Sequence, residues 1–132
     1  MRLLLIGLGR WGKNHLKVLK NLVDELYVVD SDPNQLKVCK EFSIPQDHIS
    51  TDYLDFLDRV DGVDVVTPAD SHQTICEDCF KKRKDVFVEK PIALTTTQAK
   101  EMIAKANKRE VILQVGHLYR YHPASWKIKR FI

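Results

Sequence analysis

The chain has 132 residues, of which 44% are hydrophobic and 30% are charged. This size and composition predict one soluble globular domain and exclude a disordered chain. The net charge of +3 is too small to indicate a nucleic-acid-binding protein, and no apolar run approaches the roughly 20 residues of a membrane-spanning helix.

Apolar runs alternate with helical patterns along the chain. In chain order, strands are expected at residues 2–6, 27–29, 48–50, 63–67, 85–89 and 110–115. Helices are expected between them, at residues 10–21, 34–42, 52–57, 72–82 and 95–108. This alternation predicts the α/β class, as a doubly wound parallel sheet with helices on both faces.

Three of these helices have recognisable starts in the sequence. Residues 31–33, Ser-Asp-Pro, offer a cap and a proline at the first helical position. Ser71 is expected to cap the helix that follows it. Thr95 and Gln98 form a capping box, in which each side chain bonds the backbone of the other.

The chain has three cysteines, Cys39, Cys76 and Cys79. An odd number without a secretory signal predicts reduced thiols in the cytoplasm, since the first strand occupies the N-terminus. Cys76 and Cys79 form a CxxC pair, but a zinc site needs two more ligands at suitable spacing, and we expect no metal. We expect both thiols on the buried side of a helix, with a redox pair as the alternative.

A glycine motif at residues 7–12 lies between the first strand and the first helix, which is the pattern of a dinucleotide site. Gly7 permits a tight turn after the strand. Gly9 leaves room for a pyrophosphate, and Gly12 lets the helix pack close to the strand. The free amides at the helix start then face the phosphate charge.

Asp30 directly follows the second strand, where a carboxylate can accept hydrogen bonds from a ribose diol. It would repel a 2′-phosphate, so the sequence favours NAD over NADP as the cofactor. An ordinary strand–turn–helix connection is the alternative interpretation of the glycines. The residues expected to bind the cofactor in this part of the chain are Gly7, Leu8, Gly9, Arg10, Trp11, Gly12 and Asp30.

Further polar segments follow the later strands, at residues 67–72, 89–91 and 116–117. Ligands of open α/β sheets bind beyond the carboxyl ends of the strands. We therefore expect these segments to gather at the same edge of the sheet as Asp30.

Four motifs in this order resemble the Gfo/Idh/MocA oxidoreductases, which are NAD(P)-dependent dehydrogenases of sugars, sugar nucleotides, inositols and related polyols. They are the glycine motif, Thr67-Pro68 with the trailing His72, Glu89-Lys90-Pro91, and Gly116-His117 followed by Arg120-Tyr121-His122-Pro123. The resemblance covers residues 1–123. His122 departs from the family pattern, which more often has asparagine there.

The resemblance implies that Lys90 is the catalytic residue, close to the nicotinamide and in contact with the reacting hydroxyl. Its ammonium can orient that hydroxyl and stabilise negative charge that develops on the oxygen. Glu89 is then expected at the nicotinamide ribose, and Pro91 is expected to fix the turn. A solvent-facing lysine at an ordinary strand end is the alternative.

The same resemblance implies roles for five further residues. Thr67 and Pro68 are expected to line the nicotinamide side of the cleft. His72 either approaches the cofactor or caps its helix. His117 and Arg120 are expected to contact the substrate, with an ordinary loop histidine and a surface ion pair as the alternatives.

Family members also carry a second, α+β substrate domain, which these 132 residues do not contain. Residues 1–123 are then the dinucleotide-binding domain, and residues 124–132 begin the helix that leads to the missing domain. The expected protein is the cofactor half of an NAD-dependent dehydrogenase, truncated and catalytically incomplete alone. Its exposed sheet edge could allow a homo-oligomer to form. A nucleotide-sensing module and a non-catalytic remnant are the alternatives.

Overall fold

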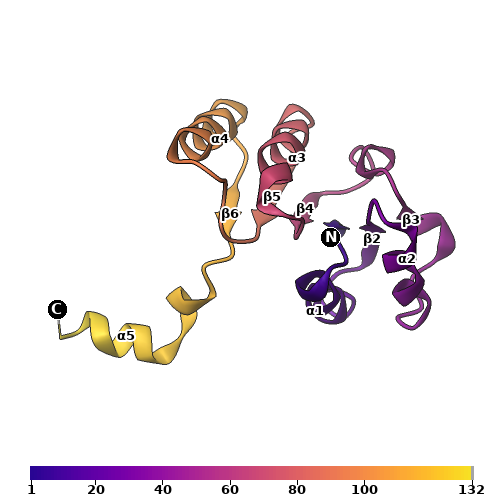
Figure 1. Ribbon diagram of the computed structural model, residues 1–132, viewed down its shortest axis with the longest axis horizontal. Coiled ribbons are helices and arrows are strands. Elements are labelled where there is room, and N and C mark those ends of the chain that lie inside the picture. Colours follow the sequence, from indigo (N-terminus) through magenta and orange to yellow (C-terminus); the bar gives the residue numbers. More distant parts are fainter. Residues whose placement is uncertain (132) are drawn as a thin grey trace.

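A single six-stranded sheet with the strand order β3-β2-β1-β4-β5-β6 organises the molecule, and every neighbouring pair of strands is parallel (Figure 1). The computed structural model describes residues 1–131. The strands are β1 Arg2–Ile6, β2 Glu25–Val29, β3 Ile49–Ser50, β4 Gly62–Val65, β5 Asp85–Val88 and β6 Leu113–Val115. The predicted doubly wound α/β fold is therefore confirmed, and the strand order reverses between β1 and β4.

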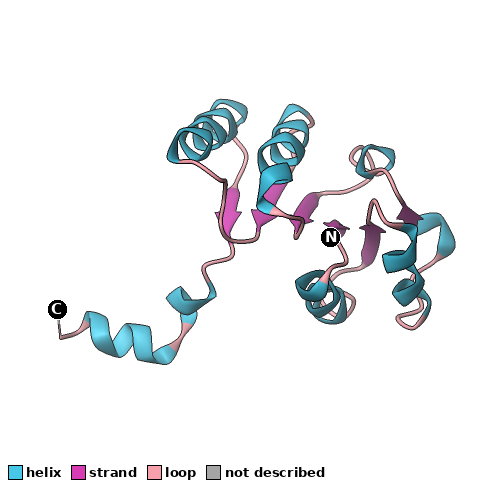
Figure 2. Cartoon of the chain, viewed as in Figure 1, coloured by secondary structure: helices cyan, strands magenta, loops and turns pink. Residues whose placement is uncertain are grey.

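Helices cover both faces of the sheet, with α3 and α4 on one side and α1 and α2 on the other (Figure 2). The α-helices are α1 Arg10–Leu19, α2 Pro33–Leu36, α3 Ala69–Lys81, α4 Thr96–Arg109 and α5 Pro123–Lys129. Short 3₁₀ turns are η1 Lys37–Lys40, η2 Gln46–His48, η3 Tyr53–Asp55 and η4 Leu118–Tyr121.

The two faces of the sheet carry separate apolar cores. Successive strand residues point to opposite faces, so Leu4 packs toward α3 and α4, where Phe80 and Met102 are fully buried. Leu5 points the other way and packs in the core that contains Leu16 of α1. Because both faces are covered, the central strands read as continuous apolar runs in the sequence.

The predicted capping box of α4 is confirmed, but the predicted cap of α3 is wrong. Thr95 Oγ1 accepts the Gln98 N–H, and Gln98 Oε1 accepts the Thr95 N–H. Helix α3 begins at Ala69, directly after Pro68, so Ser71 lies inside its first turn. The Ser71 hydroxyl lies 2.7 Å from the Pro68 carbonyl oxygen, a contact within its own turn.

Two other predicted helices are shorter than expected, and so is the last strand. The segment 34–42 forms only α2 and then η1, and the segment 52–57 forms only η3. Strand β6 begins at Leu113 because Glu110, with φ 56°, takes the left-handed conformation that ends α4. Local propensity is a weak guide in such short segments, where tertiary packing decides the winding.

After β6 the chain leaves the sheet, and α5 extends away from the body of the molecule (Figure 1). Neither η4 nor α5 has a buried residue. The exposed large apolar side chains there are Leu118, Tyr119, Tyr121, Trp126, Ile128 and Phe131. In residues 1–131, no helix has the length and apolar character to cross a bilayer.

Candidate functional site

The predicted site segments gather at one edge of the sheet, as expected. Asp30 follows β2, Thr67 comes just after β4, Glu89 follows β5 and Gly116 follows β6. Since all the strands are parallel, these carboxyl ends share one edge. The cavities at this edge include one beside β1, β2 and β4, and one beside the ends of β5 and β6.

The first cavity, which we call the cofactor cavity, has a volume of about 760 Å³. The predicted cofactor residues on its wall are Gly7, Gly9, Asp30, Thr67 and Pro68. A Cβ atom built on Gly9 would meet no other atom within 4 Å, so this backbone faces open space. That is the condition for a phosphate to approach the turn closely.

The other two glycines of the motif are needed for the turn itself. Gly7 has φ +99°, and a Cβ on it would lie 2.7 Å from the Val66 carbonyl oxygen. A Cβ on Gly12 would lie 1.9 Å from the Gly7 carbonyl oxygen, so α1 packs directly against the turn. Leu8 is fully buried, whereas Arg10 is exposed at the start of α1.

Asp30 is held in the cofactor cavity by two backbone amides. One carboxylate oxygen accepts the Leu8 N–H at 2.6 Å, and the other accepts the Asp32 N–H at 2.9 Å. A carboxylate has about four acceptor positions, so each oxygen keeps capacity for a ribose hydroxyl. The open backbone at Gly9 and this oriented carboxylate fit a dinucleotide cofactor.

The second cavity, which we call the substrate cavity, has a volume of about 490 Å³. Its wall brings together Lys90, His117 and Arg120, the residues predicted to contact the substrate, and it includes Pro91. Lys90 and Arg120 are both solvent-exposed. Two cationic side chains therefore face one small cavity, which suits it to oxygen-rich or anionic ligands.

The buried His72 contacts a segment from the wall of each cavity. Its side chain is 1% exposed, with Nδ1 3.0 Å from the Pro91 carbonyl oxygen and Nε2 2.9 Å from the Thr67 carbonyl oxygen. The ring therefore joins the wall of the cofactor cavity to the Glu-Lys-Pro turn. Both nitrogens already face protein oxygens, so the structure gives His72 a supporting position behind the two segments.

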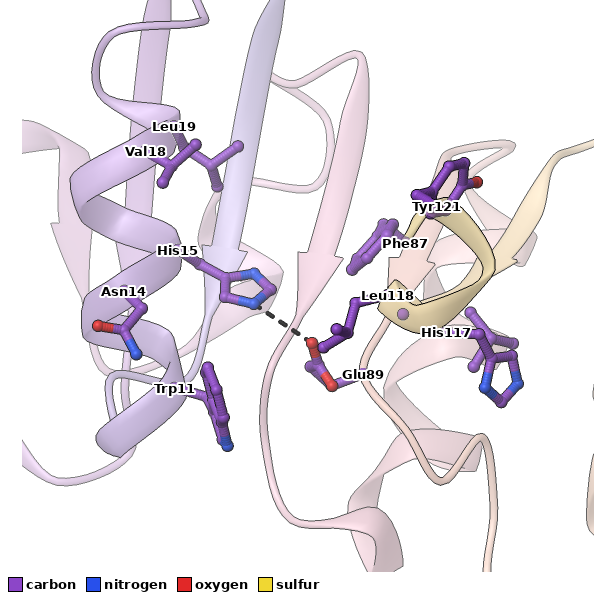
Figure 3. Close-up of a pocket in the computed structure, with 12 residues that line it drawn as sticks. Trp11, Asn14, His15, Val18, Leu19, Phe87, Glu89, His117, Leu118 and Tyr121 are labelled. Carbon is purple, nitrogen blue, oxygen red and sulfur yellow. Dashed lines mark ion pairs between the residues drawn. The ribbon is translucent and has the colours of Figure 1, made fainter. Parts of the chain in front are cut away.

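A charged cluster beside the turn was not predicted from the sequence. His15 Nδ1 lies 2.7 Å from Asp64 Oδ2. His15 Nε2 lies 3.4 Å from Glu89 Oε1, the ion pair that Figure 3 marks. Asp64 is 4% exposed and is the one charged residue within β4. A carboxylate inside a buried apolar strand was the available signal, because such groups need a partner.

Hydrogen bonding and burial shift the pKa values of this cluster. The hydrogen bond to Asp64 raises the pKa of His15, burial opposes that rise, and the charges of Asp64 and Glu89 add to it. Burial raises the pKa of Asp64, while the hydrogen bond to His15 lowers it. Burial has the larger effect at Asp64, so the pKa of Asp64 is raised overall. At His15 the hydrogen bond has the larger effect, so the pKa of His15 is also raised.

His15 and Glu89 of this cluster line a third cavity, of about 390 Å³, on the α1 side of the sheet. Trp11 lies at its rim and is 52% exposed, so the tryptophan of the glycine motif faces this cavity (Figure 3). Phe87 and Leu118 form apolar parts of its wall.

Both cysteines of the CxxC pair lie in the core, as expected, and so does the third cysteine. Cys39, Cys76 and Cys79 are free and fully buried. Burial raises the pKa of Cys39 to about 11 and that of Cys76 to about 12. Thiols of this kind are poor nucleophiles. Among residues 1–131, no group of three or more His, Cys, Asp or Glu side chains is placed to hold a metal ion.

Comparison with known proteins places residues 1–117 in the oxidoreductase family with an NAD-binding Rossmann fold. A UDP-N-acetylglucosamine 3-dehydrogenase of Acidithiobacillus ferrooxidans is 30% identical over 130 residues, which cover 94% of this chain and 39% of that protein. The scyllo-inositol 2-dehydrogenase (NAD(+)) of Bacillus subtilis is 33% identical over 138 residues, which cover 100% of this chain and 40% of that protein.

Solved structures have the same fold. The A. ferrooxidans enzyme GnnA matches with a TM-score of 0.89 and 27% identity, over 98% of this chain and 42% of that one. GenD2 from gentamicin A biosynthesis, solved in complex with NAD, matches with a TM-score of 0.84 and 31% identity, over 93% and 36% of the two chains. The chain thus spans about two fifths of the length of the curated relatives it matches, 39% and 40% in the two cases above.

Proposed function

Because the chain belongs to the Gfo/Idh/MocA oxidoreductase family, we propose that it binds NAD for hydride exchange with a secondary hydroxyl of a sugar, sugar nucleotide or polyol. One observation carries this proposal: the cofactor cavity and the substrate cavity lie at the same sheet edge. The names of the relatives, which include a sugar-nucleotide dehydrogenase and an inositol dehydrogenase, support this substrate class.

The choice of NAD over NADP rests on Asp30. Its carboxylate is fixed by the amides of Leu8 and Asp32, so it cannot swing away without losing two hydrogen bonds. A fixed negative charge favours a ribose diol and opposes a 2′-phosphate. Bound NAD supplies the hydride acceptor, and the residues that would hold it are Gly7, Gly9, Asp30, Thr67 and Pro68.

We assign the reacting hydroxyl to Lys90. A hydride can leave a carbinol carbon only as the hydroxyl proton departs, so a polar group must contact that oxygen. The Lys90 ammonium can hold the hydroxyl and stabilise its developing charge. His117 and Arg120 line the same cavity and would bind the rest of the substrate. Because an ammonium cannot accept the departing proton, the base that takes it is proposed to come from the part of the relatives that this chain does not match, and complete catalysis needs that part.

Titration calorimetry with NAD and NADP tests the cofactor assignment. We expect the wild-type chain to bind NAD at least tenfold more tightly than NADP, since one charge-assisted hydrogen bond is worth about 1.5 kcal/mol. Asp30→Asn should weaken NAD binding and reduce the ratio of the affinity for NAD to the affinity for NADP. Asp58→Asn is the matched control, because Asp58 is exposed and pairs with Lys82 away from the cavity. Absence of binding of either dinucleotide at millimolar concentration would disprove the proposal.

A further inference from the structure

We propose that His15 is a positioning residue: it holds Glu89, and through Glu89 the turn at Lys90, against α1, the helix that follows the glycine turn. This rests on the proposed function, because it assigns His15 to the same site. Neither His15 nor Asp64 belongs to the glycine motif or to any of the three motifs that follow it in the chain.

His15 bridges two carboxylates from different strands. It projects from α1, one turn after Gly12, and contacts Asp64 of β4 through one ring nitrogen and Glu89, directly after β5, through the other. Figure 3 shows the His15 ring facing Glu89. The side chains of His15, Asp64 and Glu89 are 18%, 6% and 15% exposed. Because all three are mostly removed from solvent, water screens their interactions only weakly.

The Glu89 carboxylate is also fixed on its other side. Its Oε2 accepts the backbone N–H of Lys90 at 3.0 Å, so the carboxylate that His15 holds is bonded to the turn itself. A Cβ atom on Gly116 would lie 2.9 Å from Glu89 Oε1 and 3.1 Å from its Cδ. Gly116, directly after β6, has no side chain and therefore leaves the space that this carboxylate occupies.

Charge gives His15 a reason to be in this position. Two carboxylates near each other repel, and a cation between them converts that repulsion into attraction. Asp64 Oδ1 has no hydrogen-bond partner within residues 1–131, which leaves Oδ2 and its bond to His15. The shifted pKa of His15 favours the charged ring.

The test compares two ligands that differ only at the nicotinamide end. NADH reaches the Lys90 turn in the proposed site, whereas ADP-ribose lacks the nicotinamide. His15→Gln should weaken NADH binding about tenfold and leave ADP-ribose binding unchanged, since the ion pair with Glu89 is the contact of His15 to the turn at Lys90 and the bond to Asp64 lies away from it. His48→Gln is the matched control: His48 is half-buried and bonds the Leu26 carbonyl at 3.2 Å, outside both cavities.

A pH series separates positioning from a merely structural role. Because the pKa of His15 is raised, the ring is charged and holds Glu89 just below that pKa. This interaction is lost as pH rises through the pKa. The affinity of the wild-type chain for NADH should therefore fall as pH rises through the His15 pKa. This fall should be absent in His15→Gln. The other charged or titratable groups that face His15 or its cavity are Asp64, Glu89, His117 and Tyr121.

Several outcomes would overturn the inference. Equal losses for NADH and ADP-ribose, or no loss for either, would show that His15 does not act on the turn. A pH dependence that persists in full in His15→Gln would do the same. If His15→Gln does not fold, Asp64→Asn must reproduce the selective loss, because Asp64 contacts His15 and lines neither the cofactor cavity nor the substrate cavity. A wild-type chain that binds neither ligand would instead disprove the proposed function.

Discussion

Gly12→Ala should destabilise the fold, whereas Gly9→Ala should spare it. The added methyl of Gly12→Ala would lie 1.9 Å from the Gly7 carbonyl oxygen. A relaxed carbon–oxygen contact is about 3.3 Å, so α1 would have to move more than 1 Å, roughly, away from the turn. Since the contacted atom is backbone, no side-chain rotation relieves the overlap.

The magnitude follows from two opposing effects. Overpacking of this severity costs about 3 kcal/mol, and replacing a helical glycine with alanine returns about 1 kcal/mol. We expect a net loss of about 2 kcal/mol. At about 2.1 cal/mol/K per residue, the unfolding entropy of a chain of this length makes that loss equal to about 7 °C in the melting temperature.

Gly9→Ala is the matched comparison. Gly9 has φ −60° and ψ −166°, which an alanine adopts freely, and its Cβ would meet nothing within 4 Å. Its stability should stay within about 0.5 kcal/mol of the wild type, while NAD binding should weaken because the methyl enters the cofactor cavity. Calorimetric melts and NAD titrations measure both effects. A Gly12→Ala variant as stable as the wild type would refute the packing argument.

Three other outcomes are expected. Phe80→Ala should lower the free energy of unfolding by about 3–5 kcal/mol, since Phe80 is 1% exposed; a change below 1 kcal/mol, roughly, in urea titrations would contradict its place in the core. Thr95→Ala should cost about 1 kcal/mol through the lost cap of α4, and an unchanged urea midpoint would argue against the capping box. Because burial raises the pKa values of Cys39, Cys76 and Cys79, iodoacetamide at pH 8 should label them only after unfolding. Mass spectrometry of the native chain would show rapid labelling if a reactive pair were present.

The sheet was predictable because each strand has a pattern of its own. β1 and β2 are buried on both faces, so their apolar runs stand out without knowledge of the fold. The glycine motif and Asp30 could likewise be found, since their spacing reflects one local unit of strand, turn and helix. The gathering of the polar segments at one edge of the sheet could then be predicted, because the carboxyl ends of parallel strands share an edge.

The remainder depended on contacts between distant parts of the chain. His15 and Glu89 lie on different elements, and nothing in their local sequences shows that they meet. The role of His72 was open for the same reason, because its two carbonyl partners come from separate loops. The start of α3 was misplaced because Ser71 has a capping side chain, although the helix already begins after Pro68.

The separation of the two cavities has an evolutionary consequence. The cofactor cavity is built from the ends of β1, β2 and β4, and the substrate cavity from the ends of β5 and β6. Outside the residues that contact both sets, such as His72 and His15, mutations in one set of loops can therefore accumulate with little effect on the other. A lineage with this arrangement can keep one cofactor while its substrates diversify.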